Sequence, residues 1–263
     1  MEIIGYLASI LIGISLGLIG GGGSILTVPV LVYLFTIDTV LATTYSLFVV
    51  GSTSLVGSFS YFKKGFIDIK TALFFGIPSI IAVFLTRHYL LAAIPEHVMN
   101  VGGFELSKSI LLMVFFAVLM VFASYSMIKK DREENASNTK SAKTNWVIAQ
   151  GVVVGLVTGL IGAGGGFLII PALVNLLRLP MKTAIGTSLV IIAVNSLMGF
   201  SFSLGHYPID WEFLLTVSLI AIVGIFIGTY LSTKIDGKKL KPAFGWFVLV
   251  MGIYILIKET ILK

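Results

Sequence analysis

GLIGGGGSILTVP, residues Gly17 to Pro29, and GLIGAGGGFLIIP, residues Gly159 to Pro171, are the stretches of sequence that decide the fold. They align without a gap at an offset of 142 residues, with eight of thirteen positions identical. Each lies inside an apolar segment of more than thirty residues, at 3–35 and 146–177. One straight helix of that length would span about 50 Å, against a hydrocarbon core of about 30 Å. Because each glycine lowers helix stability by about 1 kcal/mol, we predict that each segment breaks at its glycines into two helical pieces.

The same offset continues beyond these stretches and indicates an internal duplication. It carries Ala42 onto Ala184, Ser46-Leu47 onto Ser188-Leu189, Ser54 onto Ser196, Gly57 onto Gly199 and Asp68 onto Asp210. The predicted N-terminal repeat, 1–128, contains the broken segment 3–35 and spans at 39–62, 67–87 and 107–128. A polar linker, 129–145, leads to the C-terminal repeat, 146–263, which contains the broken segment 146–177 and spans at 182–204, 211–233 and 241–261.

The composition places the chain in a membrane. Of its 263 residues, 57% are hydrophobic and 11% are charged, whereas about 25% of residues are charged in soluble globular proteins. The Lys and Arg residues behind the net charge of +6 lie almost entirely in loops between apolar runs, where they set orientation. A soluble enzyme, a nucleic-acid-binding protein and a disordered chain are therefore excluded. The sequence has no cysteine, so disulfides and thiolate metal sites are excluded as well.

The positive charges also orient the two repeats. The linker is the most basic loop, with five Lys or Arg residues between 129 and 143, so we place it in the cytoplasm. If 146–177 returns to its starting side as a re-entrant hairpin, every cluster of neighbouring basic residues is cytoplasmic. If it crosses the membrane instead, the four lysines between 234 and 241 lie outside. The hairpin therefore agrees better with the positive-inside rule, and it predicts inverted repeats with both termini external.

The predicted fold class is thus an all-α polytopic membrane protein built from two inverted repeats. Each repeat is a glycine-broken re-entrant helical hairpin plus three transmembrane helices. A break inside the membrane exposes backbone N–H and C=O groups, which are tolerated only where they face protein or a water-filled cavity. The second piece of each hairpin begins just after the glycines, and its free N–H groups and helix dipole favour an anion. The alternative is that the glycines serve close helix packing alone.

The predicted anion site combines the two glycine tips with neutral polar residues on the helix that follows each hairpin. Hydroxyl and amide groups can donate hydrogen bonds to a small oxyanion. They can equally bond between helices, at about 0.6 kcal/mol each, and the sequence leaves both roles open. The predicted residues are Gly20, Gly21, Gly22, Gly23, Ser24, Thr43, Thr44 and Ser46 in the first repeat, and Gly162, Gly164, Gly165, Gly166, Thr187, Ser188 and Asn195 in the second.

No Asp, Glu, Lys or Arg lies in the middle of a predicted span, so a proton relay built on carboxylates is not predicted. Uniport of the anion, exchange of anions, and entry of protons on the anion itself stay open. Arg87, Arg178 and Lys182 lie near span ends, where they can act as interfacial anchors or attract anions, and we favour anchoring. The three histidines lie in or beside loops and form no H-E-x-x-H motif. We therefore do not predict an enzyme, and we predict no cofactor and no metal site.

The two glycine stretches, followed by A-x-G-T-S-L at Ala184 to Leu189, resemble the TauE/SafE sulfite exporter family, also called the 4-toluene sulfonate uptake permeases. The resemblance covers nearly the whole chain. It implies a multi-pass transporter in the inner membrane of a bacterium or archaeon that exports small sulfur-containing anions such as sulfite or organosulfonates. The first repeat departs from the motif, with Thr44-Tyr45-Ser46-Leu47 where the second has Gly186-Thr187-Ser188-Leu189.

The predicted function is therefore secondary transport of such oxyanions, with the two repeats moving against each other to alternate access. The predicted partners are the small anion and the lipid bilayer. The choice of anion, the coupling ion and assembly into homo-oligomers are left open. A membrane scaffold or sensor subunit without transport activity, and an anion channel, remain as alternatives.

Overall fold

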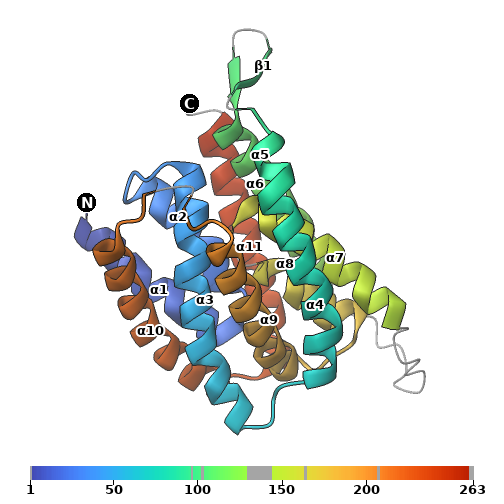
Figure 1. The fold of residues 1–263 in the computed structure, drawn as a ribbon. Helices are drawn as coiled ribbons and strands as arrows, with labels where there is room; N and C mark the ends of the chain where they lie inside the picture. The colour runs from blue at the N-terminus through green and yellow to red at the C-terminus, as the bar shows by residue number, and fades with distance from the viewer. Residues whose placement is uncertain are drawn as a thin grey trace.

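The computed structural model describes residues 2–95, 97–101, 104–128, 144–162, 165–205 and 208–260. These residues form a bundle of helices with a small β-hairpin projecting from one end (Figure 1). The first half contains α1 (Glu2–Ile19), α2 (Gly22–Tyr33), α3 (Thr39–Lys63), α4 (Ile69–Leu85), the π-helical turn η1 (Thr86–Leu90), α5 (Leu91–Ala93), β1 (His97–Val101), β2 (Phe104–Ser107) and α6 (Lys108–Ile128). The second half contains α7 (Thr144–Ile161), α8 (Gly166–Pro171), the π-helical turn η2 (Ala172–Leu176), α9 (Met181–Ser201), α10 (Trp211–Lys234) and α11 (Gly237–Thr260).

Six of these helices are long and apolar enough to cross a membrane, and each overlaps one of the six spans predicted from the sequence. The all-α polytopic fold class is therefore confirmed. The β-hairpin is an element that the sequence analysis did not predict. Its strands pair antiparallel, with His97 opposite Ser107 and Val101 opposite Phe104. Its signal was the Gly102-Gly103 pair between two short β-prone runs, a sequence typical of tight hairpin turns. Most of the predicted linker, 129–143, lies outside the described residues.

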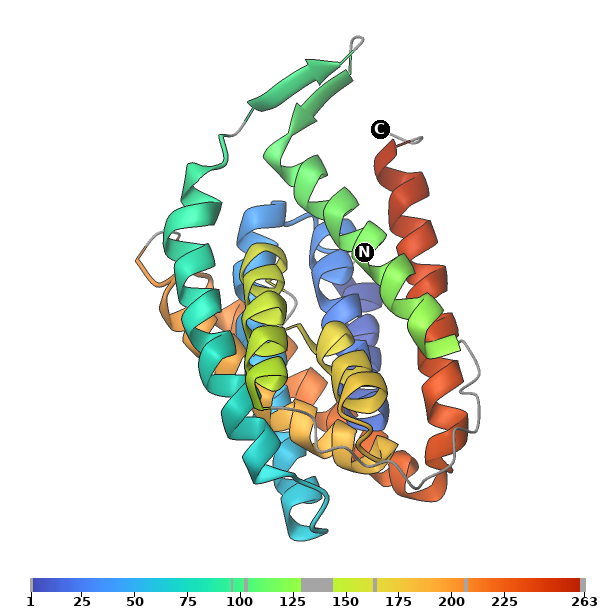
Figure 2. The same ribbon diagram turned by 90° about the vertical axis from the view of Figure 1, so that its right-hand side faces the viewer.

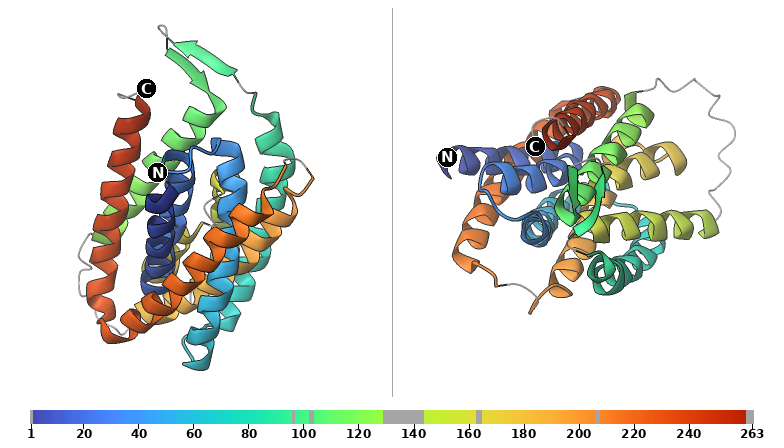
Figure 3. Two further views of the ribbon diagram at one scale, coloured as in Figure 1. Left: turned by 90° about the vertical axis from the view of Figure 1, so that its left-hand side faces the viewer. Right: turned by 90° about the horizontal axis from the view of Figure 1, so that it is seen from above.

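The packing of the helices follows the duplication. With the offset of 142 residues, α1 corresponds to α7, α3 to α9 and α4 to α10, while α6 and α11 match only as the last helix of each half. The four most extensive contacts between helices join α1 to α10, α6 to α11, α4 to α7 and α3 to α9. The pairs α1–α10 and α4–α7 exchange under this correspondence, whereas α3–α9 and α6–α11 each join the matching helices of the two halves. Figure 3 shows α10 crossing α1 in this way. Each hairpin therefore packs on a helix from the other half, so the halves are interlocked.

Two aspartates at matched positions fix the ends of α4 and α10. Asp68 and Asp210 each accept a hydrogen bond from the backbone N–H three residues later, at 3.1 Å, and so cap these helices. The backbone N–H of Asp68 donates to the Thr187 hydroxyl of α9 at 2.9 Å, and that of Asp210 donates to the Tyr45 hydroxyl of α3 at 2.7 Å. The start of α9 therefore lies beside the end of α3, and the start of α3 lies beside the end of α9. The helices α3 and α9 thus run antiparallel.

The two broken segments meet at their tips inside the bundle. The helical breaks fall inside the glycine clusters, between Ile19 and Gly22 and between Ile161 and Gly166. Figure 2 shows the α1–α2 hairpin open toward the β1–β2 end and the α7–α8 hairpin open toward the α3–α4 turn. The hairpins bring their own apolar side chains into the main core, where Ile25 is fully buried. The glycine tips of both hairpins therefore lie inside protein, as exposed backbone in a membrane requires.

Candidate functional site

The chain turns back at Gly20 in the first hairpin and at the equivalent Gly162 in the second. Their φ angles are +80° and +70°, a left-handed conformation that glycine adopts without the strain of a side chain. A Cβ atom on Gly20 would lie 2.8 Å from the Ser188 hydroxyl of α9, and one on Gly162 would collide with Thr43 of α3. Each tip therefore rests directly on a long helix, the first tip on α9 and the second on α3, with no room for a larger residue.

The tips of the two hairpins also meet each other. A Cβ atom on Gly166 would lie 2.7 Å from the Cα of Gly21 and 3.1 Å from the Ser24 hydroxyl. Gly21 is the N-cap of α2 and supplies no side-chain hydrogen bond, so the first N–H groups of this twelve-residue helix depend on other partners. The helix N-terminus thus opens toward the second hairpin, where its dipole favours negative charge.

The remaining tip glycines have more local roles. Gly22 is the first residue of α2. Gly23 packs on the α1 arm, where a Cβ atom would collide with the side chain of Leu16. Gly165 begins α8 as its N-cap in a left-handed conformation and packs on Thr158 of α7. Gly164, which the sequence analysis placed in the site, lies outside the described residues.

One face of α9 lines the tips. Ser188 contacts Gly20, and the Ile192 side chain would lie 2.7 Å from a Cβ atom on Gly166. Ser196 follows one turn further along, so these three residues, spaced by four, share a face. The equivalent residues of α3, at the same offset of 142, are Ser46, Val50 and Ser54. The two long helices therefore present matched serine–aliphatic–serine stripes.

Three of these serine hydroxyls have no hydrogen-bond partner among the described residues. They belong to Ser46, Ser54 and Ser196, and all three side chains are completely buried. Ser188 and Ser24 instead donate to backbone carbonyls of their own helices, at 2.8 Å and 2.7 Å. A hydroxyl buried without a partner costs about 1–3 kcal/mol. Each of the three hydroxyls therefore keeps a hydrogen-bond donor that no described residue uses.

Arg87 adds a positive charge at the second tip. It lies in η1, and only 8% of its surface is exposed. Its Nη1 donates to the Ser203 hydroxyl at 2.8 Å and to the Thr44 hydroxyl at 3.2 Å, while Nη2 donates to the Thr43 hydroxyl at 3.3 Å. A Cβ atom on Gly162 would lie 2.8 Å from Nη2. The guanidinium thus connects η1, α3 and the turn after α9 beside the glycine tip.

This position corrects the anchoring role that we favoured for Arg87. An anchor at a membrane surface keeps its charged head in water, whereas this guanidinium is inside the bundle. The hydroxyls of Thr43, Thr44 and Ser203 hold the guanidinium in this position. The π-helical turn admits one more residue than an α-helical turn and so rotates the side chains that follow. Regular helical spacing gives no sign of that rotation, and the sequence analysis therefore favoured an anchor over the alternative role of attracting anions.

Two predicted site residues use their side chains elsewhere. The Thr187 hydroxyl accepts the hydrogen bond from the backbone of Asp68 at the α3–α4 turn. The Asn195 amide donates to the Ser79 hydroxyl of α4 at 2.6 Å, while its carbonyl oxygen has no partner in the described chain. Conversely, Ser54 and Ser196 belong to the stripes but were left out of the predicted set, although the repeat alignment had already matched them.

The fold and these buried polar stripes define a multi-pass helical membrane protein with a candidate small-ligand site at its centre. A family model described as "Sulfite exporter TauE/SafE" matches residues 5–255, and the chain belongs to this family. It is a multi-pass protein of the plasma membrane, in a family of membrane transporters.

Several curated proteins are similar over nearly their whole length, and each is described only as a probable membrane transporter protein. One from Xylella fastidiosa is 28% identical, covering 94% of this chain and 91% of its own. YunE of Bacillus subtilis is 28% identical, covering 89% and 90%. MJ0441 of the archaeon Methanocaldococcus jannaschii is 24% identical, covering 94% and 92%. No solved structure gives a significant match.

Proposed function

We propose that the protein is a secondary transporter that exports small sulfur-containing oxyanions, such as sulfite or organosulfonates, by alternating access. The observation that carries this proposal is the group of buried hydroxyls of Ser46, Ser54 and Ser196, which lack partners among the described residues and lie on α3 and α9, the two helices on which the hairpin tips rest. The family description supports sulfite as a starting substrate.

The chemistry of the site fits an oxyanion better than a cation. A sulfite or sulfonate group presents only acceptor oxygens around one sulfur atom, and the site offers donors: serine hydroxyls, the N–H groups at the start of α2 and the guanidinium of Arg87. Hydrogen bonds from a charged donor to a charged acceptor are roughly twice as strong as neutral ones. The neutral hydroxyls complete the coordination while still allowing release, which a carrier requires.

The interlocked packing of the halves supports the alternating-access mechanism. Each hairpin tip rests on a long helix and touches the other tip, so a rotation of one repeat against the other would open the contact from one side at a time. The inverted relation of the repeats remains part of the proposal. The antiparallel course of α3 and α9 and the opposite openings of the two hairpins agree with it (Figure 2).

We expect a sulfur oxyanion to stabilise the purified protein. A ligand at 100 times its Kd adds about 2.7 kcal/mol to the free energy of unfolding, which raises the Tm by several degrees. A thermal-shift panel of sulfite, alkyl and aryl sulfonates, sulfate and carboxylates, followed by flux of the best ligand into vesicles, measures this. A scaffold or sensor subunit would give no flux, and a channel would give single-channel currents.

We expect single cysteines to label according to inverted repeats. The native chain has no cysteine, so Lys64→Cys, Thr36→Cys and Pro208→Cys can be made without removing a background. These positions are exposed and lie in the turns that follow α3, α2 and α9. Lys64→Cys should react only with reagents on the cytoplasmic side, and the other two only from outside. Labelling of all three from one side would contradict the inverted arrangement.

A further inference from the structure

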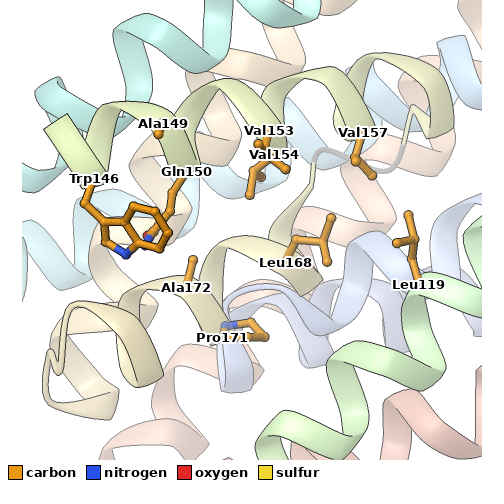
Figure 4. A pocket seen from close by; sticks show the side chains of 10 residues that line it. All are labelled: Leu119, Trp146, Ala149, Gln150, Val153, Val154, Val157, Leu168, Pro171 and Ala172. Atoms are coloured by element: carbon orange, nitrogen blue, oxygen red, sulfur yellow. The ribbon is translucent and has the colours of Figure 1, made fainter.

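A lateral groove runs between α6 and the two arms of the second hairpin, α7 and the α8–η2 segment (Figure 4). It has a volume of about 410 Å³, within the range of about 300–1,000 Å³ that is typical of small-molecule sites. Nine of the ten residues that line it have apolar or aromatic side chains, and the tenth is Gln150. Val153 and Trp146, at its mouth, are 59% and 58% exposed. The groove therefore opens on the side of the bundle that faces lipid.

Gln150 is the unusual member of the lining. Only 9% of it is exposed, and neither its amide nitrogen nor its carbonyl oxygen has a hydrogen-bond partner in the part of the chain that the structure describes. Figure 4 shows its side chain pointing from α7 toward Ala172, on the same side of the helix as Trp146. A buried amide without partners is costly in a membrane, so a ligand with a polar group at this depth would be retained by it.

The polar end of the groove lies at the level expected for a membrane interface. Trp146 and Gln150 are in the first two turns of α7, which begins at Thr144 directly after the polar linker. Tryptophan is enriched where headgroups meet acyl chains. The rest of the groove, from Val153 to Leu168, is apolar. A ligand that fills it is therefore polar at one end and a hydrocarbon chain along its length.

The groove has no matched counterpart in the other half of the chain. At the offset of 142 residues, Gln150 corresponds to Ala8 and Ala172 corresponds to Val30. The first repeat therefore lacks the amide and has a larger side chain where Ala172 leaves room. This asymmetry separates the groove from the matched serine stripes.

We propose that this groove binds one acyl chain of a membrane phospholipid, with the ester carbonyl of that chain accepting a hydrogen bond from the Gln150 amide. The bilayer supplies such chains at high concentration along the whole face. The ester carbonyl is the polar group nearest to the start of the chain, which matches the order of Gln150 followed by the apolar lining. The proposal stands independently of the transported substrate.

Native mass spectrometry of the detergent-solubilised full chain can test the proposal, after delipidation and addition of diacyl phosphatidylglycerol or its dialkyl ether analogue. The two lipids share their headgroup and chain length, and only the first has ester carbonyls. We expect the wild type to retain one diacyl lipid about tenfold more strongly than the ether lipid, the value of a hydrogen bond to a buried amide. Gln150→Leu should bind both lipids alike, and Ala149→Trp, which fills the mouth, should bind neither.

Val223→Trp on the exposed face of α10 is the matched control for Ala149→Trp. Val223 is exposed, as Ala149 is, and it lies on a helix that does not line the groove. It should retain the wild-type preference. The proposal is overturned if the wild type retains no lipid, if Gln150→Leu keeps the preference for the ester, or if Ala149→Trp still binds lipid. A dimer that forms through this face without lipid would overturn it as well.

Discussion

Replacing Arg87 with Gln is expected to lower the rate of oxyanion transport on the order of a hundredfold. The guanidinium is a charged donor beside the second glycine tip, where a Cβ atom on Gly162 would lie 2.8 Å from Nη2. A hydrogen bond to a charged group is worth about 1.5–3 kcal/mol, and about 2.7 kcal/mol corresponds to a hundredfold in rate. Glutamine can still bond to the Thr43 and Thr44 hydroxyls but brings no charge. Initial rates of anion flux into proteoliposomes, normalised to inserted protein, measure the effect.

Two variants distinguish charge from general damage at this position. Arg87→Lys keeps the charge but loses the planar fork, so we expect a loss of about tenfold. Thr229→Val alters the position that corresponds to Arg87 in the other repeat, where the Thr229 hydroxyl donates to backbone carbonyls of its own helix. It should change the rate less than twofold. Two results would contradict a role of Arg87 in the site. One is an equal loss of anion flux in all three folded variants, and the other is wild-type flux in Arg87→Gln.

The duplicated sequence gives the two tips the same scaffold and different chemistry. Tyr61 and Ser203 occupy equivalent positions. Near the first tip, the Tyr61 hydroxyl donates to the Gly17 carbonyl at 3.0 Å and shares a short hydrogen bond with Ser232. Near the second tip, Ser203 accepts from Arg87. The first tip is thus held by neutral groups and the second by a cation. The binding free energy of an anion is therefore expected to differ between the two tips.

Local signals made much of the fold predictable. Apolar length and glycine clusters act within one segment, so the six spans and the two helical breaks could be located from the sequence alone. The partners of individual side chains could not, because they depend on how distant helices pack. Asn195 reaches Ser79 on α4, and Thr187 reaches the backbone of Asp68, across more than a hundred residues of sequence. The burial of Arg87 could not be predicted either, because it lies in a π-helical turn that the sequence pattern does not reveal.

Replacing Gly166 with Ala is expected to reduce transport by ten- to a hundredfold while the protein still inserts and folds. The added methyl group would lie 2.7 Å from both the Gly21 Cα and the Ile192 side chain, so the two hairpin tips must separate. Such overpacking typically costs about 1–3 kcal/mol, and here it also widens the contact that has to open and close. Flux and thermal unfolding of the same preparation measure both effects.

Gly76→Ala is the matched control, because Gly76 is a buried helical glycine of α4 with no atom within 4 Å of an added Cβ. It should leave transport unchanged and raise stability by about 0.5–1 kcal/mol, since alanine is the better helix former. The comparison separates the effect of crowding between the hairpin tips from the general effect of replacing a helical glycine with alanine. If Gly166→Ala transports as fast as Gly76→Ala, the meeting of the tips is packing alone, and the buried serines need another explanation.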